Sequence, residues 1–236
     1  MKKVIVVSGG TRGIGKAIVF KFAKEGFDVI TCSRKADQLQ YLENEFVNEF
    51  PNSRLTAIQA DLSKKEEVSA FVKKINETTD KIDVLVNNTG VFLPGQIHKE
   101  EDGALEFQIE TNLYSAYYLT RGLVHGMVDR RSGYIFNICS TASITAYTNG
   151  GSYCISKYAM YGMTKVLREE MKPYGVKVTA VLPGATLTSS WEGAGLPNER
   201  FMKPDDVADA IFATYSLSAN TVVEEILLRP QEGDIG

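Results

Sequence analysis

Seven short runs rich in Val, Ile and Leu recur along this chain of 236 residues, each separated from the next by a longer segment. A near-continuous apolar run is typical of a strand buried on both faces, as in a parallel sheet covered by helices. Because crossovers between parallel strands are right-handed, strands alternating with helices favour a doubly wound sheet. The sequence therefore predicts an α/β protein with a single-domain Rossmann fold, a doubly wound seven-stranded parallel sheet with helices on both faces. The expected strands are 4–8, 28–32, 55–59, 82–87, 133–138, 176–182 and 224–228.

The segments between these runs have the amphipathic spacing of helices that cover a sheet. We expect helices at 13–25, 36–50, 64–79, 102–130, 152–172 and 204–217. With 44 % hydrophobic and 23 % charged residues, a chain of this length can bury one full core. The sequence contains no repeat, low-complexity tract or linker, so residues 1–236 are expected to form one domain.

Charge, apolar length and cysteine usage argue against several classes of partner. The net charge is −3 and no run of Lys or Arg provides a nucleic-acid footprint, so we expect no nucleic-acid binding. The apolar runs are too short to span a bilayer, and MKKVIVV lacks the length of a signal peptide, so we expect no membrane association. The three cysteines, Cys32, Cys139 and Cys154, have no metal-ligand spacing and fit free thiols in a reducing compartment. We therefore expect a cytoplasmic protein without a bound metal.

The stretch SGGTRGIG at 8–15 lies between the first expected strand and the first expected helix. Gly9, Gly13 and Gly15 have the spacing G-x-x-x-G-x-G. Glycine permits a tight turn and lets a pyrophosphate approach the backbone N–H groups at a helix N-terminus. A plain strand-to-helix turn is the simpler interpretation. Because a strand precedes the loop and a helix and second strand follow it, the pattern favours a dinucleotide site.

The end of the second strand bears on the choice between NAD and NADP. A carboxylate there binds the ribose hydroxyls of NAD, whereas a cation accommodates the 2′-phosphate of NADP. Arg34, which follows Ser33, is well placed for that phosphate, and Arg12 in the glycine loop offers a second guanidinium. Asp37 lies only three residues beyond Arg34 and keeps NAD open. The sequence favours NADP(H), with NAD(H) as the alternative.

Six motifs occur in the order found in short-chain dehydrogenases/reductases, and the chain resembles this family over almost its whole length. Tyr153 follows Ser140 by thirteen residues, the separation usual in the family. Three motifs depart from the family pattern: Ser8 replaces the Thr of T-G-x-x-x-G-x-G, Thr89 replaces the Ala of N-N-A-G, and Cys139 replaces the first Ser of N-I-S-S. The matching motifs are SGGTRGIG at 8–15, Asn87-Asn88-Thr89-Gly90, Asn112, Asn137-Ile138-Cys139-Ser140, Tyr153 with Lys157, and Pro183-Gly184 with Thr188.

The resemblance implies a catalytic set of Ser140, Tyr153, Lys157 and Asn112. A Tyr and a Lys four residues apart lie on one face of a helix, and a nearby ammonium lowers the pKa of a phenol. Tyr153 would then donate a proton to the carbonyl oxygen, and Ser140 would stabilise that oxygen through a hydrogen bond. By family analogy, Lys157 also holds the nicotinamide ribose, and Asn112 anchors a water that links Lys157 to solvent.

The same resemblance implies that the cofactor lies along the glycine loop and the ends of the following strands. Asp61 would contact the adenine end, and Thr188 would close over the nicotinamide carboxamide. The residues expected to bind the cofactor are Gly9, Thr11, Arg12, Gly13, Ile14, Gly15, Ser33, Arg34, Asp61, Leu62, Asn88, Thr89, Gly90, Tyr153, Lys157, Pro183, Gly184, Thr186 and Thr188.

The loops at the carboxyl ends of the strands, 91–98, 141–151 and 189–201, should set substrate specificity. Phe92, Tyr147 and the only tryptophan, Trp191, favour an apolar pocket. Trp191 either belongs to a lid over the site or packs on its own loop, and the sequence leaves both open.

The leading hypothesis is an NADPH-dependent carbonyl reductase that acts on a small or medium ketone or the matching alcohol. The alternatives are a 3-oxoacyl-carrier-protein reductase and a sensor or scaffold that binds NADP(H) without turnover. The tail EILLRPQEGDIG lacks the Gly-Gly-rich ending common in 3-oxoacyl-carrier-protein reductases and is closer to sepiapterin-reductase-like and 3-hydroxy-acid-dehydrogenase-like members. Because family members pair the helices matching 102–130 and 152–172, we expect a homodimer or homotetramer.

Overall fold

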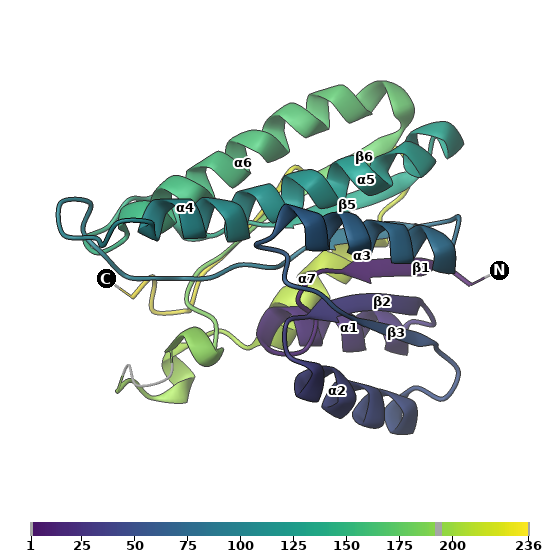
Figure 1. The fold of residues 1–236 in the computed structure, drawn as a ribbon, viewed down its shortest axis with the longest axis horizontal. Helices are drawn as coiled ribbons and strands as arrows, with labels where there is room; N and C mark the ends of the chain where they lie inside the picture. Colours follow the sequence, from purple (N-terminus) through teal and green to yellow (C-terminus); the bar gives the residue numbers. More distant parts are fainter. Residues whose placement is uncertain (1, 192–194, 236) are drawn as a thin grey trace.

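The computed structural model describes residues 2–191 and 195–235. Its strands form one parallel sheet in the order β3-β2-β1-β4-β5-β6-β7 (Figure 1). The chain winds outward in one direction through β3 and in the other through β7, so the predicted doubly wound fold is confirmed. The strands are β1 Val4–Val7, β2 Asp28–Ser33, β3 Leu55–Gln59, β4 Val84–Asn87, β5 Gly133–Ile138, β6 Val176–Pro183 and β7 Glu225–Leu228.

Most helices begin and end within two residues of the predicted bounds. The α-helices are α1 Gly13–Lys24, α2 Ala36–Glu49, α3 Lys65–Thr78, α4 Ala104–Ile109, α5 Ser115–Arg130, α6 Gly151–Met171 and α7 Pro204–Tyr215. Short 3-10 helices are η2 Thr141–Ser143, η3 Lys172–Tyr174, η4 Ser189–Trp191 and η5 Asn198–Arg200. None of these described helices has the length and apolar character needed to cross a membrane.

The helix predicted over 102–130 is present over 104–130, but one of its turns is not α-helical. Gly103, with φ of +88°, precedes α4, and a turn of π-helix, η1 Glu110–Tyr114, separates α4 from α5. A π-turn adds a residue to the helical repeat and is frequent at functional sites. Here it carries Asn112 and turns its side chain inward, where only 1 % of the residue is exposed.

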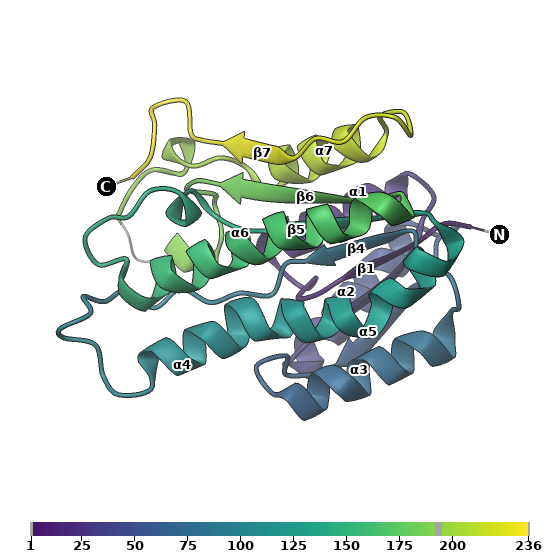
Figure 2. The ribbon, with the colours of Figure 1, turned by 90° about the horizontal axis from the view of Figure 1, so that it is seen from above.

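Two apolar cores cover the two faces of the sheet. On one face, Phe22 of α1, Phe46 of α2 and Ile211 of α7 pack against the strands. On the other, Phe71 of α3 and Leu119 of α5 do so (Figures 1 and 2). Because both faces are covered, each strand needs apolar residues at successive positions, which explains the continuous runs in the sequence.

The strand order reverses between β1 and β4, and in such sheets ligands bind beyond the carboxyl ends of the strands at that point. Figure 2 shows that the loop before α4, the loop before α6 and the segment after β6 gather at this end of the sheet. The C-terminal tail reaches the same end (Figure 1). The fold thus brings the predicted cofactor and substrate segments to one edge.

Candidate active site

The glycine loop between β1 and α1 depends on backbone shapes and close contacts that only glycine allows. Gly9 and Gly13 have φ of +69° and +53°, in the left-handed region. A Cβ on Gly15 would lie 2.2 Å from the Gly9 carbonyl oxygen and 2.4 Å from the Asn88 side-chain nitrogen. The turn therefore opens α1 with its backbone uncovered, the arrangement that cradles a pyrophosphate.

Ser8 and Asn88 clamp the glycine loop to the end of β4. The Ser8 hydroxyl accepts hydrogen bonds from the backbone N–H groups of Asn88 and Thr89, at 2.9 and 3.0 Å. The Asn88 side chain donates to the carbonyls of Ser8 and Gly9, at 2.9 and 3.0 Å. Asn88 and Thr89 thus lie against the glycine loop, as predicted, with Ser8 as a support that the sequence reasoning did not single out.

The adenosine end of the predicted site lies between α1 and the end of β2. The Thr11 and Ser33 hydroxyls both donate to the Gln38 side-chain oxygen, at 3.1 and 3.3 Å. The side chains of Arg12 and Arg34 are exposed, and neither forms an ion pair within residues 2–191 and 195–235. Both guanidinium groups are thus available to an anion at this end.

Asp61 and Leu62 are placed differently from each other. The Asp61 carboxylate accepts hydrogen bonds from the Ser63 backbone N–H and hydroxyl, at 3.1 and 2.8 Å, and so stabilises the turn before α3. Leu62 is 3 % exposed, and its side chain packs in the core beside α3. Only the backbone of Leu62 remains for contact with a ligand.

The segment after β6 closes over the glycine loop from the other side. A Cβ on Gly13 would lie 3.0 Å from a Thr188 methyl carbon, so Thr188 lies directly against the start of α1. The Gly184 N–H donates to Leu228 O at 2.8 Å, which continues the pairing of β6 with β7. The Thr186 hydroxyl bonds to Gly184 O at 3.0 Å and is buried. Of the two predicted threonines, Thr188 is therefore the one that faces the loop.

Ser140 and Tyr153 come together from two different elements. Ser140 lies two residues beyond β5 and caps η2, where its hydroxyl oxygen accepts a hydrogen bond from Ala142 N at 3.1 Å. Tyr153 lies in the first turn of α6, and its phenol is close enough to the Ser140 hydroxyl for that hydroxyl to lower the phenol pKa. The predicted Ser–Tyr pair is thus assembled at the carboxyl edge of the sheet.

Lys157, one turn further along α6, is 5 % exposed. Its Nζ donates to Ile138 O at 2.9 Å and lies 5.8 Å from the centre of the Tyr153 ring. Burial lowers the pKa of Lys157. Burial also raises the pKa of Tyr153 to about 12, against a smaller lowering by Ser140. The predicted lowering of the phenol pKa by Lys157 is therefore not seen in the chain alone, where desolvation is the largest influence on Tyr153 and the lowering comes from Ser140.

Asn112 connects the π-turn to the end of β4 and to α6. Its side-chain oxygen accepts from Val91 N at 2.7 Å, and its nitrogen donates to Val91 O and to the Ser156 hydroxyl, at 3.0 and 2.9 Å. A Cβ on Gly90 would lie 3.3 Å from that Asn112 oxygen and 3.5 Å from Lys157 Nζ. The predicted Asn, Gly and Lys residues are therefore neighbours.

Two of the predicted substrate loops meet at Tyr153. The Phe92 ring packs edge-on against the Tyr153 ring, with centroids 4.8 Å apart, and Tyr147 is near enough to the same phenol to interact with it electrostatically. Trp191 packs on Phe201 with centroids 5.2 Å apart, which agrees with the second of the two alternatives left open by the sequence, packing on its own loop. Residues 192–194 of the predicted loop 189–201 lie outside the described residues.

Sequence reasoning did not single out Gln38, Glu100 or Ser156. Gln38 contacts Thr11 and Ser33, and the Ser156 hydroxyl bridges Asn112 to Tyr153 O, to which it donates at 2.7 Å. Glu100 binds Ser152 across 52 positions in the chain. Such contacts depend on the fold and leave no periodic or local signal, although the position of Ser156 beside Lys157 provides a partial one.

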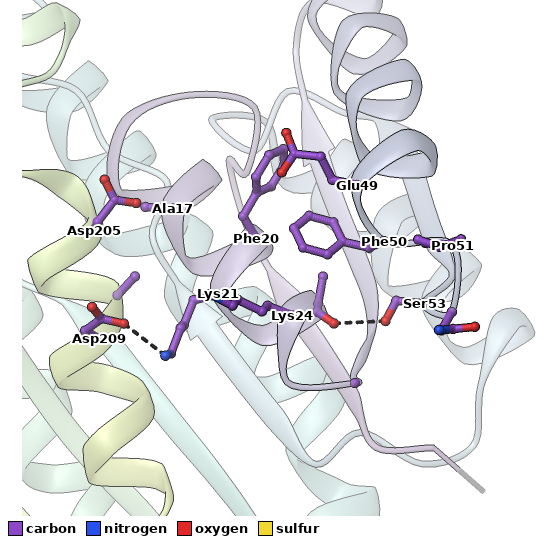
Figure 3. Close-up of a pocket in the computed structure, with 14 residues that line it drawn as sticks. Ala17, Phe20, Lys21, Lys24, Glu49, Phe50, Pro51, Ser53, Asp205 and Asp209 are labelled. Carbon is purple, nitrogen blue, oxygen red and sulfur yellow. Dashed lines mark hydrogen bonds and ion pairs between the residues drawn. The ribbon is translucent and has the colours of Figure 1, made fainter.

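A separate groove of about 830 Å³ lies between α1, the end of α2 and the start of α7 (Figure 3). Phe20 and Phe50 lie on one side of it, and the Lys21–Asp209 ion pair, 3.0 Å long, lies on the other. Its lining includes none of the residues predicted for catalysis or cofactor binding among those that the structure describes. The groove is therefore distinct from the candidate active site.

A doubly wound sheet with a glycine loop after β1 and a Ser–Tyr–Lys cluster beyond β5 defines a class of Rossmann-fold oxidoreductases. Over residues 3–196 the sequence matches the family described as short chain dehydrogenase, and the chain belongs to this family.

Relatives of known name span the whole chain. Sepiapterin reductase of Chlorobaculum tepidum is 32 % identical over 243 residues, covering 100 % of this chain and 99 % of that protein. The alcohol dehydrogenase of Thermococcus sibiricus, solved with 5-hydroxy-NADP, has a TM-score of 0.92 at 27 % identity and full coverage of both chains. The L-sorbose reductase of Gluconobacter frateurii, solved with NADPH and L-sorbose, has a TM-score of 0.88 at 26 % identity, covering 96 % of this chain and 95 % of that one.

The contacts of Gly15 predict a difference between two Gly→Ala substitutions. Gly15→Ala should lower the free energy of unfolding by roughly 1–3 kcal/mol, because the loop must shift away from Gly9 and Asn88. Gly162→Ala in α6 has nothing within 4 Å of the added methyl group and should be neutral or stabilising by up to about 1 kcal/mol. Urea unfolding of both variants measures the difference, and equal effects would contradict the account of the loop.

Proposed function

We propose that this protein is an NADPH-dependent carbonyl reductase. The observation that carries the proposal is the cluster of Ser140, Tyr153 and Lys157 at the sheet edge that also bears the glycine loop. A proton donor, a hydrogen-bond donor for the same oxygen and a buried cation are the groups that reduction of a carbonyl requires of a protein.

The glycine loop fits a pyrophosphate, because Gly9 and Gly13 adopt left-handed backbone shapes before α1 and no side chain caps the N-terminus of that helix. When bound, NADPH supplies the hydride that the carbonyl carbon receives. Ser140 and Tyr153 would bind the carbonyl oxygen between their hydroxyls, each donating a hydrogen bond to it. The Tyr153 O–H bond then breaks, and its proton forms the new alcohol O–H.

The raised pKa of the Tyr153 phenol supports its role as the acid in this reaction. Burial raises the pKa of Tyr153 to about 12, so the phenol holds its proton at neutral pH. Lys157 lies near enough to stabilise the phenolate that forms as the proton leaves, and Asn112 together with Ser156 holds the surrounding turns.

The choice of NADPH over NADH rests on Arg12 and Arg34. Both guanidinium groups are exposed at the adenosine end, where a 2′-phosphate would receive charge-assisted hydrogen bonds. The solved relatives bound to NADPH or to 5-hydroxy-NADP support this choice. We propose a small or medium neutral ketone as substrate, because the apolar ring of Phe92 packs against the phenol.

Copies of the chain are expected to pair through the outer face of the helices η1, α5 and α6. Tyr114, Tyr117, Ile155, Tyr158 and Val166 leave 41–58 % of their surface exposed there. Large apolar side chains gathered on neighbouring helices favour burial against a second copy. A homodimer or homotetramer is the assembly we propose.

Tyr153→Phe tests the proposed chemistry. Loss of the proton donor should lower kcat roughly 10²–10⁴-fold while the Kd for NADPH is kept, because the ring and its packing on Phe92 remain. The assay follows NADPH oxidation with a panel of diketones, pterins and 3-oxoacyl thioesters. Turnover kept in the variant would contradict the assignment. An inactive wild-type protein that still binds NADPH tightly would instead favour a sensor.

Arg12→Ala and Arg34→Ala test the cofactor assignment. Each should weaken NADPH binding roughly tenfold or more and leave NADH binding unchanged, because only NADPH carries the 2′-phosphate. Arg54→Ala is the matched control, an exposed arginine before β3 that should affect neither cofactor. Fluorescence titration measures the affinities, and an equal loss for NADH would contradict the prediction.

A further inference from the structure

The segment 91–100, here called the strap, connects β4 towards α4 and is fastened at both ends. Asn112 binds Val91, and the Gln108 side-chain oxygen accepts from Leu93 N at 3.1 Å. Further along, Gly95 N donates to Asn149 O at 2.9 Å, just before α6. The strap is thus fixed between the π-turn and the start of α6.

Glu100 attaches the end of the strap to the first turn of α6. Ser152 N donates to one carboxylate oxygen of Glu100 at 2.9 Å, and the Ser152 hydroxyl donates to the other. Gly150, the residue before α6, has no side chain to cap the helix. A carboxylate that accepts from the first turn does the work of an N-cap and interacts favourably with the helix dipole. Glu100 therefore caps α6 from a distant part of the chain.

The space for this carboxylate is made by two glycines. A Cβ on Gly95 would lie 2.6 Å from Glu100 Cγ, and a Cβ on Gly151 would lie 2.0 Å from the carboxylate oxygen that Ser152 N binds. Both glycines thus allow Glu100 to approach the helix N-terminus. The Glu100 side chain therefore has a defined position between these glycines and the start of α6, whereas its neighbour Glu101 is exposed.

The Glu100 carboxylate is bound next to the proposed proton donor, Tyr153. Ser152 precedes Tyr153, and the strap that Glu100 fastens carries Phe92, whose ring packs against Tyr153. We propose that Glu100 is a positioning residue that holds Phe92 against Tyr153, so that Phe92 forms one wall of the substrate site. This inference rests on the proposed function of Tyr153.

Glu100→Ala should raise the KM for a neutral aromatic ketone, 1-phenyl-1,2-propanedione, about tenfold, and leave the Kd for NADPH unchanged. The control is Glu101→Ala, which removes the same charge one position away and should change neither value. Glu100→Gln, which keeps one acceptor oxygen, should restore part of the loss. Equal effects of the two Ala variants would overturn the proposal.

A mutant cycle separates positioning from a merely structural role. Phe92→Ala should lower kcat/KM in the wild-type background but have little further effect in Glu100→Ala, because the wall is already lost there. Additive effects would overturn the proposal. If Glu100→Ala does not fold, the same cycle is measured with Ser152→Ala, which removes only the hydroxyl donor. Activity kept in Tyr153→Phe would refute the proposed function itself. If Tyr153→Phe is inactive but the Glu100 variants keep the wild-type KM and kcat, only the positioning role of Glu100 would be refuted.

Discussion

The burial of Tyr153 and Lys157 beside each other is the constraint on which the site depends. An apolar surrounding opposes charge on both groups, so it raises the pKa of the phenol and lowers that of the ammonium. The Ile138 carbonyl, at 2.9 Å, partly offsets the cost of keeping Lys157 charged. The phenol therefore retains its proton until a reaction at its oxygen makes the loss favourable, which is the behaviour of an acid rather than a base.

Several layers of the fold keep these two groups in place. The clamp between Ser8 and Asn88 fixes the glycine loop to β4, and Asn112 fixes β4 to α6 through Ser156. On the other side of Tyr153, Glu100 fixes the strap to the first turn of α6. Because these supports converge on one helix turn, small changes in them should alter catalysis without unfolding the protein.

The sheet and the grouping of Ser140 with Tyr153 could be predicted from sequence, because they depend on local pattern and spacing. Continuous apolar runs indicated buried strands, and the thirteen-residue step from Ser140 to Tyr153 placed both at one edge. The π-turn at Asn112 could not be predicted, since its residues have ordinary helical propensities. The pKa of Tyr153 went in the direction opposite to the prediction, because spacing along a helix says nothing about desolvation. The contact of Glu100 with Ser152 required the tertiary fold.

The pH dependence of ketone reduction shows whether Tyr153 acts as a protonated acid. The measurement is the single-turnover rate constant of the NADPH-saturated wild-type protein with a neutral ketone, over a range from acid to alkaline pH. If protonated Tyr153 is the donor, the rate constant is level through neutral pH and falls only on the alkaline side as the phenol ionises. A rate constant that rises with pH would mean that ionised Tyr153 is the active form, which would contradict its assignment as the proton donor.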